Sequence, residues 1–152
     1  MERIVKSIEV ECPVTTVYNQ WTQFEEFPRF MEGVKEVVQL DDKGLHWVAE
    51  IGGKTKEWNA RITEQIPDQR IAWTSEAGEY TSGLVTFEPI GPNRTRVTLE
   101  LSYDPKGMLE AAGDALGVVS RRIEKDLERF KEFIENRQRE TGAWRGTIRD
   151  QA

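Results

Sequence analysis

The fold is decided by one stretch near the end of the chain, residues 105–140, which has the sequence PKGMLEAAGDALGVVSRRIEKDLERFKEFIENRQRE. Its apolar residues recur in steps of three or four, the spacing of a single stripe along an amphipathic helix; they are Leu109, Ala112, Leu116, Val119, Ile123, Leu127, Phe130 and Ile134. A stripe of this length needs an apolar partner. Because no second long helix is predicted and several strand-like segments precede this one, we expect the helix to pack on one face of a sheet.

The residues before this helix predict seven strands and two short helices. Residues 3–11 alternate apolar and polar side chains, and Pro13 then opens a short helix. A further turn of helix is predicted at residues 27–31. Six segments separated by turn residues follow, namely residues 34–40, 45–51, 54–66, 70–75, 82–89 and 95–103. This order predicts an α+β fold in which a seven-stranded, curved antiparallel sheet wraps around the terminal helix.

One face of the predicted sheet is apolar. Gly52 and Gly53 predict a two-residue hairpin, which sets Trp47 opposite Trp58. Alternation then places these residues on one face: Leu45, Trp47, Ala49, Ile51, Trp58, Ala60, Ile62, Ile71, Trp73, Gly83, Val85, Phe87, Val97, Leu99, Leu101 and Tyr103. The other face is mainly charged or hydroxylated, which is typical of an antiparallel sheet with one solvated side. We expect the helix to cover the apolar face and to leave a cavity for a small apolar molecule.

Length and charge exclude several classes of protein. The 152 residues predict a single domain over residues 1–140 and a polar, loosely attached tail at residues 141–152. In this tail, Trp144 is expected to dock either on the domain or on another subunit.

A formal net charge of −6 argues against a nucleic-acid partner. We expect a monomer or weak homodimer.

The sequence also indicates a cytoplasmic protein. Cys12 is the only cysteine, so no intramolecular disulfide can form. No segment approaches the apolar length of a membrane span, and residues 1–11 lack the continuous apolar core of a signal peptide.

Four short motifs lie within residues 2–140: WTQFEEFPRFMEGV at 21–34, PDQRIAW at 67–73, GLVTF at 83–87 and TRVTL at 95–99. Together with the order of elements they resemble the START-like (SRPBCC) helix-grip superfamily, specifically the polyketide cyclase/dehydrase group that also contains the coenzyme Q-binding START proteins. The resemblance implies a helix-grip fold whose cavity holds lipids, quinones, hormones or polyketide chains, and in some members catalyses cyclisation or dehydration. It assigns no active residue, because no catalytic motif matches.

The ligand-binding candidates come from the apolar face and the helix stripe; they are Trp47, Trp58, Trp73, Phe87, Leu101, Tyr103, Leu116 and Val119. Flat indole rings suit planar or polyene ligands, and core packing explains the same rings equally well. Tyr103 and Ser75 are the catalytic candidates, because a hydroxyl at a cavity mouth could orient a carbonyl or donate a proton. For Tyr103 the alternative is a boundary tyrosine whose hydroxyl group lies in water.

No metal or cofactor is predicted. His46, the only histidine, is expected to point to solvent on the polar face, and scattered carboxylates offer no metal-ligand spacing. The predicted cavity leads to two hypotheses about the function. The first is a carrier or sensor of a hydrophobic ligand, and the second is an aromatase-type cyclase or dehydratase. A module that binds other proteins without a ligand is the third alternative.

Overall fold

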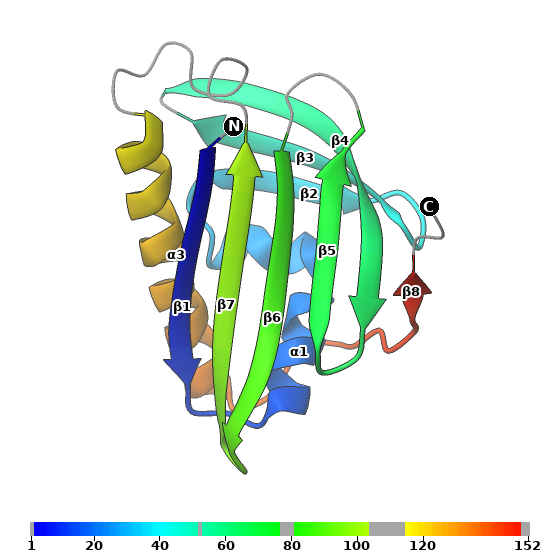
Figure 1. The fold of residues 1–152 in the computed structure, drawn as a ribbon, viewed down its shortest axis with the longest axis vertical. Coiled ribbons are helices and arrows are strands. Elements are labelled where there is room, and N and C mark those ends of the chain that lie inside the picture. The colour runs from blue at the N-terminus through cyan, green and yellow to red at the C-terminus, as the bar shows by residue number, and fades with distance from the viewer. Residues whose placement is uncertain (1, 52, 77–80, 104–114, 150–152) are drawn as a thin grey trace.

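The structure is a computed structural model that describes residues 2–51, 53–76, 81–103 and 115–149. Within these ranges it describes all side chains except those of Glu2, Ile51, Lys54, Thr81, Tyr103 and residues 115–119. A curved antiparallel sheet bends around a long helix, with two short helices closing one end (Figure 1).

The elements follow in the predicted order, except that the second short helix begins at Phe24 rather than at residue 27 and that β8 was not predicted. They are β1 (Glu2–Val10), α1 (Val14–Trp21), the 3-10 helix η1 (Phe24–Arg29), β2 (Val34–Gln39), β3 (Gly44–Ile51), β4 (Lys54–Ile66), β5 (Arg70–Ser75), β6 (Thr81–Gly91), β7 (Arg94–Tyr103), α3 (Ala115–Arg137) and β8 (Ile148–Arg149). The sheet order is β1-β7-β6-β5-β4-β3-β2, and the short β8 pairs with β4. The predicted helix-grip α+β fold with seven main strands is confirmed.

The predicted register of the β3–β4 hairpin is also confirmed. Trp47 is the partner of Trp58, and Ile51 is the partner of Lys54. One irregularity was not predicted: the pairing of β4 with β5 shifts between Ile62 and Glu64. Past this bulge Gln65, rather than Glu64, is buried opposite Ile71.

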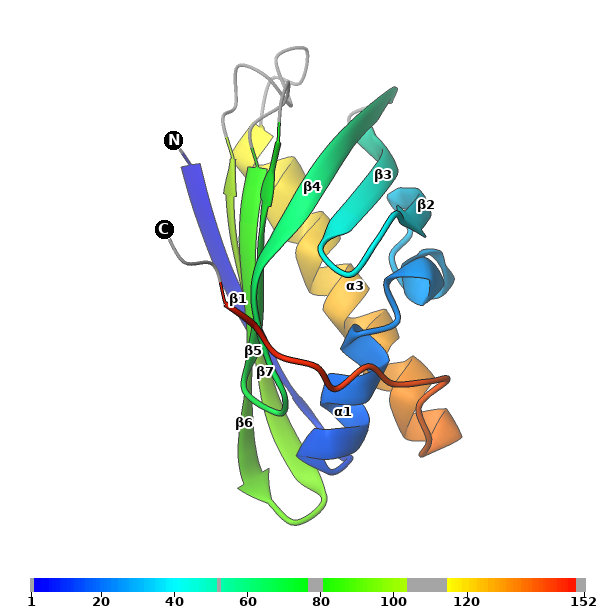
Figure 2. The same ribbon diagram turned by 90° about the vertical axis from the view of Figure 1, so that its right-hand side faces the viewer.

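Helix α3 lies along the concave face of the sheet (Figure 2). In its described part the predicted stripe is buried, with Ile123, Leu127, Phe130 and Ile134 in the core. The helix ends at Arg137, three residues before the predicted end, because Gln138 takes a left-handed φ of 54°. The Gln138 N–H donates to the Ile134 carbonyl at 2.7 Å, which closes the last turn. The predicted beginning of the helix lies outside the described residues.

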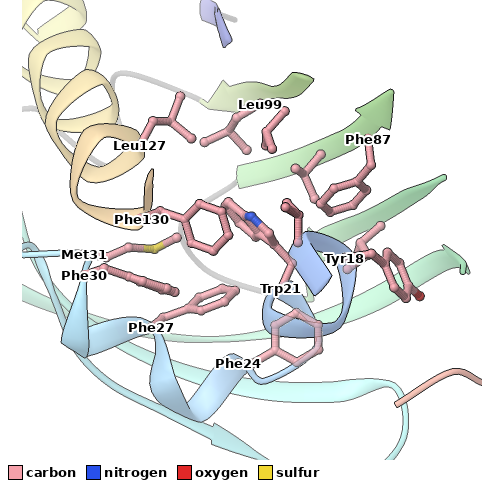
Figure 3. Packing of buried hydrophobic residues seen from close by; sticks show 14 of the residues in the cluster. Tyr18, Trp21, Phe24, Phe27, Phe30, Met31, Phe87, Leu99, Leu127 and Phe130 are labelled. Carbon is pink, nitrogen blue, oxygen red and sulfur yellow. The ribbon is translucent and has the colours of Figure 1, made fainter. Parts of the chain in front are cut away.

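An aromatic core fills the end of the concave face where α1 and η1 lie (Figure 3). The Phe130 ring packs 5.3 Å from Trp21 and 5.2 Å from Phe30, measured between ring centroids. Trp21 also packs edge-on against Phe27 at 5.4 Å. The two short helices and α3 are therefore joined through one cluster of rings.

The segment from residue 141 to residue 149 is not loosely attached, and that expectation is wrong. It crosses α1 and reaches the edge of β4 (Figure 2), where Ile148 pairs with Gln65 and is only 5% exposed. Trp144 docks on the domain, the first of the two alternatives, since it packs against the core and its backbone N–H donates to Thr22 Oγ1 at 3.1 Å.

This docked segment supplies the partners of buried polar side chains on α1. The Gln20 amide donates to Thr141 Oγ1 at 3.1 Å and accepts from the Thr141 N–H at 2.9 Å. Asn19 accepts a hydrogen bond from Arg145 at 2.7 Å. Arg145 also pairs with Asp68 at 2.9 Å. Because buried amides need hydrogen-bond partners, α1 and residues 141–149 depend on each other.

Candidate ligand-binding site

On β5 and β7 the apolar residues of the concave face become more exposed toward the end where these two strands finish. On β7, Val97 is fully buried at 0% exposure, whereas Leu101 is half-buried. On β5, Ile71 is fully buried at 0% exposure, whereas Trp73 is half-buried. This end is the upper one in Figure 1, where the first turn of α3 also lies. Here the sheet offers apolar side chains that the core does not fully cover.

Trp58 continues this partly exposed surface on β4. Its ring is stacked on Trp47, with the planes 4° apart and the ring centroids separated by 6.2 Å. Trp47 is 7% exposed and also contacts Phe27 at 5.7 Å, so it belongs to the core. Trp58 is half-buried and extends the aromatic surface from that core. A flat apolar ligand at this end would contact the Trp58 indole, whose orientation is fixed by its stacking on Trp47.

Phe87 was predicted to line the site, and the structure places it at the other end of the face. Its ring packs edge-on against Tyr18 at 5.3 Å and against Trp21 at 6.4 Å, beneath α1 (Figure 3). Burial raises the pKa of Tyr18, which is fully enclosed there. These aromatic residues fill the core and stand apart from Trp58 and Trp73.

Three candidates fall outside the described side chains: Tyr103, Leu116 and Val119. Ser75, the second catalytic candidate, is half-buried at the last position of β5, where it pairs with Ala60. It therefore lies on the candidate surface, beyond Trp73. Gly83 was not among the predicted site residues. A glycine inside a strand often marks a close approach of another group, and this signal in the sequence could have identified Gly83.

The described candidate residues on this surface carry no charge; they are Trp47, Trp58, Trp73, Ser75 and Leu101. On α3, burial raises the pKa of Asp126 to about 6. It accepts a hydrogen bond from the Glu32 N–H at 3.2 Å and pairs with Arg129 at 3.0 Å. Asp126 therefore fastens α3 to the segment before β2.

His46 lies on the opposite, solvated face, as predicted. Its Nδ1 is 2.7 Å from Asn59 Oδ1, and its Nε2 is 3.1 Å from Glu57 Oε1. Both ring nitrogens donate in the protonated form, so the bond to Asn59 and then the bond to Glu57 raise the pKa of His46. The residue ties β3 to β4 and has no part in the concave surface.

We expect the pKa of His46 to lie above its ordinary value of 6.5, and an Asn59→Ala substitution to lower it. The reason is that removing an acceptor of the protonated ring favours the neutral form. An NMR titration measures this pKa directly, because the chain has one histidine. A midpoint at or below 6.5, or one that Asn59→Ala leaves unchanged, would contradict the hydrogen-bonded geometry.

Two further findings concern the described ranges. Among these residues no group of three or more His, Cys, Asp and Glu side chains could hold a metal ion. No helix within them combines the length and the apolar character that crossing a membrane requires.

Comparisons with known proteins agree with this architecture. The model of the family described as "polyketide cyclase / dehydrase and lipid transport" matches residues 10–133. An uncharacterised 17.2 kDa protein of Streptomyces lincolnensis is 50% identical over 149 residues, covering 97% of this chain and 99% of that protein.

Two solved structures share the fold. A Streptomyces aromatase/cyclase superposes with a TM-score of 0.77 at 17% identity, covering 94% of this chain and 99% of that chain. A START superfamily protein from Mycobacterium smegmatis superposes with a TM-score of 0.69 at 18% identity, covering 89% of this chain and 95% of that chain.

Proposed function

Since the chain belongs to the polyketide cyclase/dehydrase and lipid transport family, we propose that it binds a small hydrophobic molecule between the concave face of the sheet and α3. The ligand class is a lipid, a quinone or a polyketide-like molecule, and the role is that of a carrier or sensor. The observation that carries the proposal is the rise in exposure of apolar side chains toward Trp58, Trp73 and Leu101.

Affinity at such a surface comes from apolar area removed from water. Each Å² contributes about 25 cal/mol before the costs of association are subtracted. Trp58 and Trp73 are large, flat and partly exposed, so they supply much of this area among the described residues. The absence of charge on the described candidate residues favours a ligand that is apolar where it contacts them.

The alternative is an aromatase-type cyclase or dehydratase that uses the same surface. Two observations favour it: the fold shared with the Streptomyces aromatase/cyclase and the position of Ser75 two residues after Trp73 on β5. Tyr103, at the end of β7, is the other candidate for proton transfer. A carrier returns its ligand unchanged, whereas an enzyme of this type returns a cyclised or dehydrated product.

A Leu101→Arg substitution is expected to weaken ligand binding at least about tenfold, because it places a charge among apolar groups that the ligand must cover. The ligand is first sought by native mass spectrometry and solvent extraction of freshly purified protein. Affinity is then measured by tryptophan fluorescence with quinones, fatty acids and polyketides. The matched control is Val5→Arg on the solvated face of β1, where Val5 is 49% exposed.

Two results would count against the proposal. One is a purified protein that carries no ligand and whose fluorescence responds to none of these compounds. The other is an equal effect of Leu101→Arg and Val5→Arg on affinity. Incubating the protein with a compound that it binds, and comparing that compound before and after by chromatography and mass spectrometry, separates the carrier from the enzyme, because only the enzyme returns a cyclised or dehydrated product.

A further inference from the structure

Trp73 lies across the backbone of β6 at a position that has no side chain. Trp73 and Gly83 are partners in the β5–β6 pair. A Cβ added at Gly83 would lie 2.2 Å from Cζ2, 2.5 Å from Cε2 and 2.8 Å from Cη2 of the Trp73 indole. In folded proteins a Cβ atom essentially never lies within 3.0 Å of a heavy atom outside its own residue and its chain neighbours. The indole therefore occupies the volume that any side chain at position 83 would need.

This pair stands at the boundary between the packed core and the candidate site. The cross-strand row through it contains Ile62, Trp73, Gly83, Leu101 and Ile4. The two isoleucines at its ends are buried, whereas Trp73 and Leu101 are half-buried. The Trp73 indole lies against the backbone of β6 at Gly83, and Trp73 is half-buried rather than fully buried. Trp73 thus forms part of the floor of the candidate site.

A glycine inside a strand lowers stability, and the packing of Trp73 on Gly83 offsets part of this loss. Relative to alanine it loses roughly 0.5–1 kcal/mol through its backbone freedom. An aromatic ring on the neighbouring strand can cover such a glycine and restore packing. With alanine at position 83 the indole could not stay on the backbone of β6. The ring cannot move through the sheet toward its solvated face, so it would move away from β6, toward α3 on the concave side.

We propose that the Gly83–Trp73 pair sets the depth of the ligand site and thereby admits broad, multi-ring apolar molecules. This inference rests on the proposed function and adds the ligand class and the residues that select it. A single acyl chain is narrow and does not need the indole to lie flat. A fused ring system needs the full depth and can stack on the exposed part of the indole.

The test uses two fluorescent probes, N-phenyl-1-naphthylamine as the multi-ring molecule and cis-parinaric acid as the single chain. Gly83→Ala is expected to weaken binding of the multi-ring probe about tenfold, and binding of the chain probe by less than about threefold. Gly83→Ala with Trp73→Leu is expected to bind the multi-ring probe more tightly than Gly83→Ala alone, because the smaller side chain leaves room for the new methyl group, and less tightly than the unmodified protein, because the indole is lost.

The matched control is Gly91→Ala on the same strand, where an added Cβ meets only the Arg94 Cβ at 3.5 Å, an ordinary contact. This variant should bind both probes as the unmodified protein does. Near-ultraviolet circular dichroism, which reports the surroundings of tryptophan rings, should change in Gly83→Ala and not in Gly91→Ala. Far-ultraviolet spectra check that each variant is folded.

The outcomes separate the two proposals. If the unmodified protein binds neither probe, the proposed function is contradicted. If it binds both and Gly83→Ala leaves their affinity ratio unchanged, only the present inference is overturned. If Gly83→Ala does not fold, recovery of folding and of multi-ring binding in the double variant supports the inference. Failure of the double variant to bind the multi-ring probe while binding the chain probe contradicts it.

Discussion

Phe130→Ala is expected to lower the free energy of unfolding by about 3–5 kcal/mol, the usual cost of removing a buried phenylalanine ring. Phe130 is 0% exposed and packs on both Trp21 and Phe30. Its ring joins α3 to α1 and to the residue that follows η1, so the cavity left by alanine would lie where these segments meet and could collapse only if they shifted together. Urea denaturation followed by circular dichroism measures the change.

Phe133→Ala on the same helix is the matched control. Phe133 is half-buried, packs against Phe30 at 5.3 Å and lies beneath the Arg29 guanidinium at 4.9 Å from its ring centroid. We expect this substitution to cost about 1 kcal/mol, because less apolar surface is lost and the cation–π contact is exposed. Equal losses for the two variants would show that Phe130 is not the central ring of the core.

Ending the chain after Glu140 is expected to lower the free energy of unfolding by about 2–4 kcal/mol. The truncation removes Ile148 from the β4 edge and the hydrogen-bond partners of Gln20, Asn19 and Thr22. Each lost hydrogen bond costs about 0.5–1.5 kcal/mol and burial of Ile148 contributes about 1.5–3 kcal/mol, partly offset by the freedom that the released residues regain.

A chain that ends after Arg149 is the control for this truncation, because it keeps all of these described contacts. Its melting temperature should equal that of the full chain, whereas the chain ending after Glu140 should melt several degrees lower, by differential scanning calorimetry. Equal melting temperatures for all three chains would show that residues 141–149 add no net stability. Size-exclusion chromatography in parallel detects whether the uncovered edge of β4 pairs with a second copy.

The two ends of the concave face have different roles in this structure. Rings from α1 and η1 fill one end, and this core fixes Trp47 and Phe87 in place. At the other end Trp58, Trp73 and Leu101 are only partly covered. The packed end supplies the stability that lets the other end keep an apolar surface partly open, since a ligand site forgoes packing that a core would use.

Local patterns were sufficient to predict the seven main strands, the long helix and the register of the β3–β4 hairpin. Gly52 and Gly53 define a two-residue turn, and alternation with period two then places Trp47 opposite Trp58. The stripe from Ile123 to Ile134 was predicted in the same way, from a spacing that depends only on the geometry of the helix. Such signals are carried by neighbours in the sequence, so no knowledge of the tertiary structure is needed.

The sequence by itself therefore determined the α+β architecture, the order of the strands along the chain and which face of the sheet is apolar. Only the tertiary structure decided which residues of that face are covered. Phe87 and Leu101 have the same alternation on neighbouring strands, yet α1 packs over Phe87 alone. Likewise, Gln20 is buried because residues 141–149 return to it from more than a hundred positions away. Burial depends on contacts between segments distant in sequence, and periodicity carries no record of them.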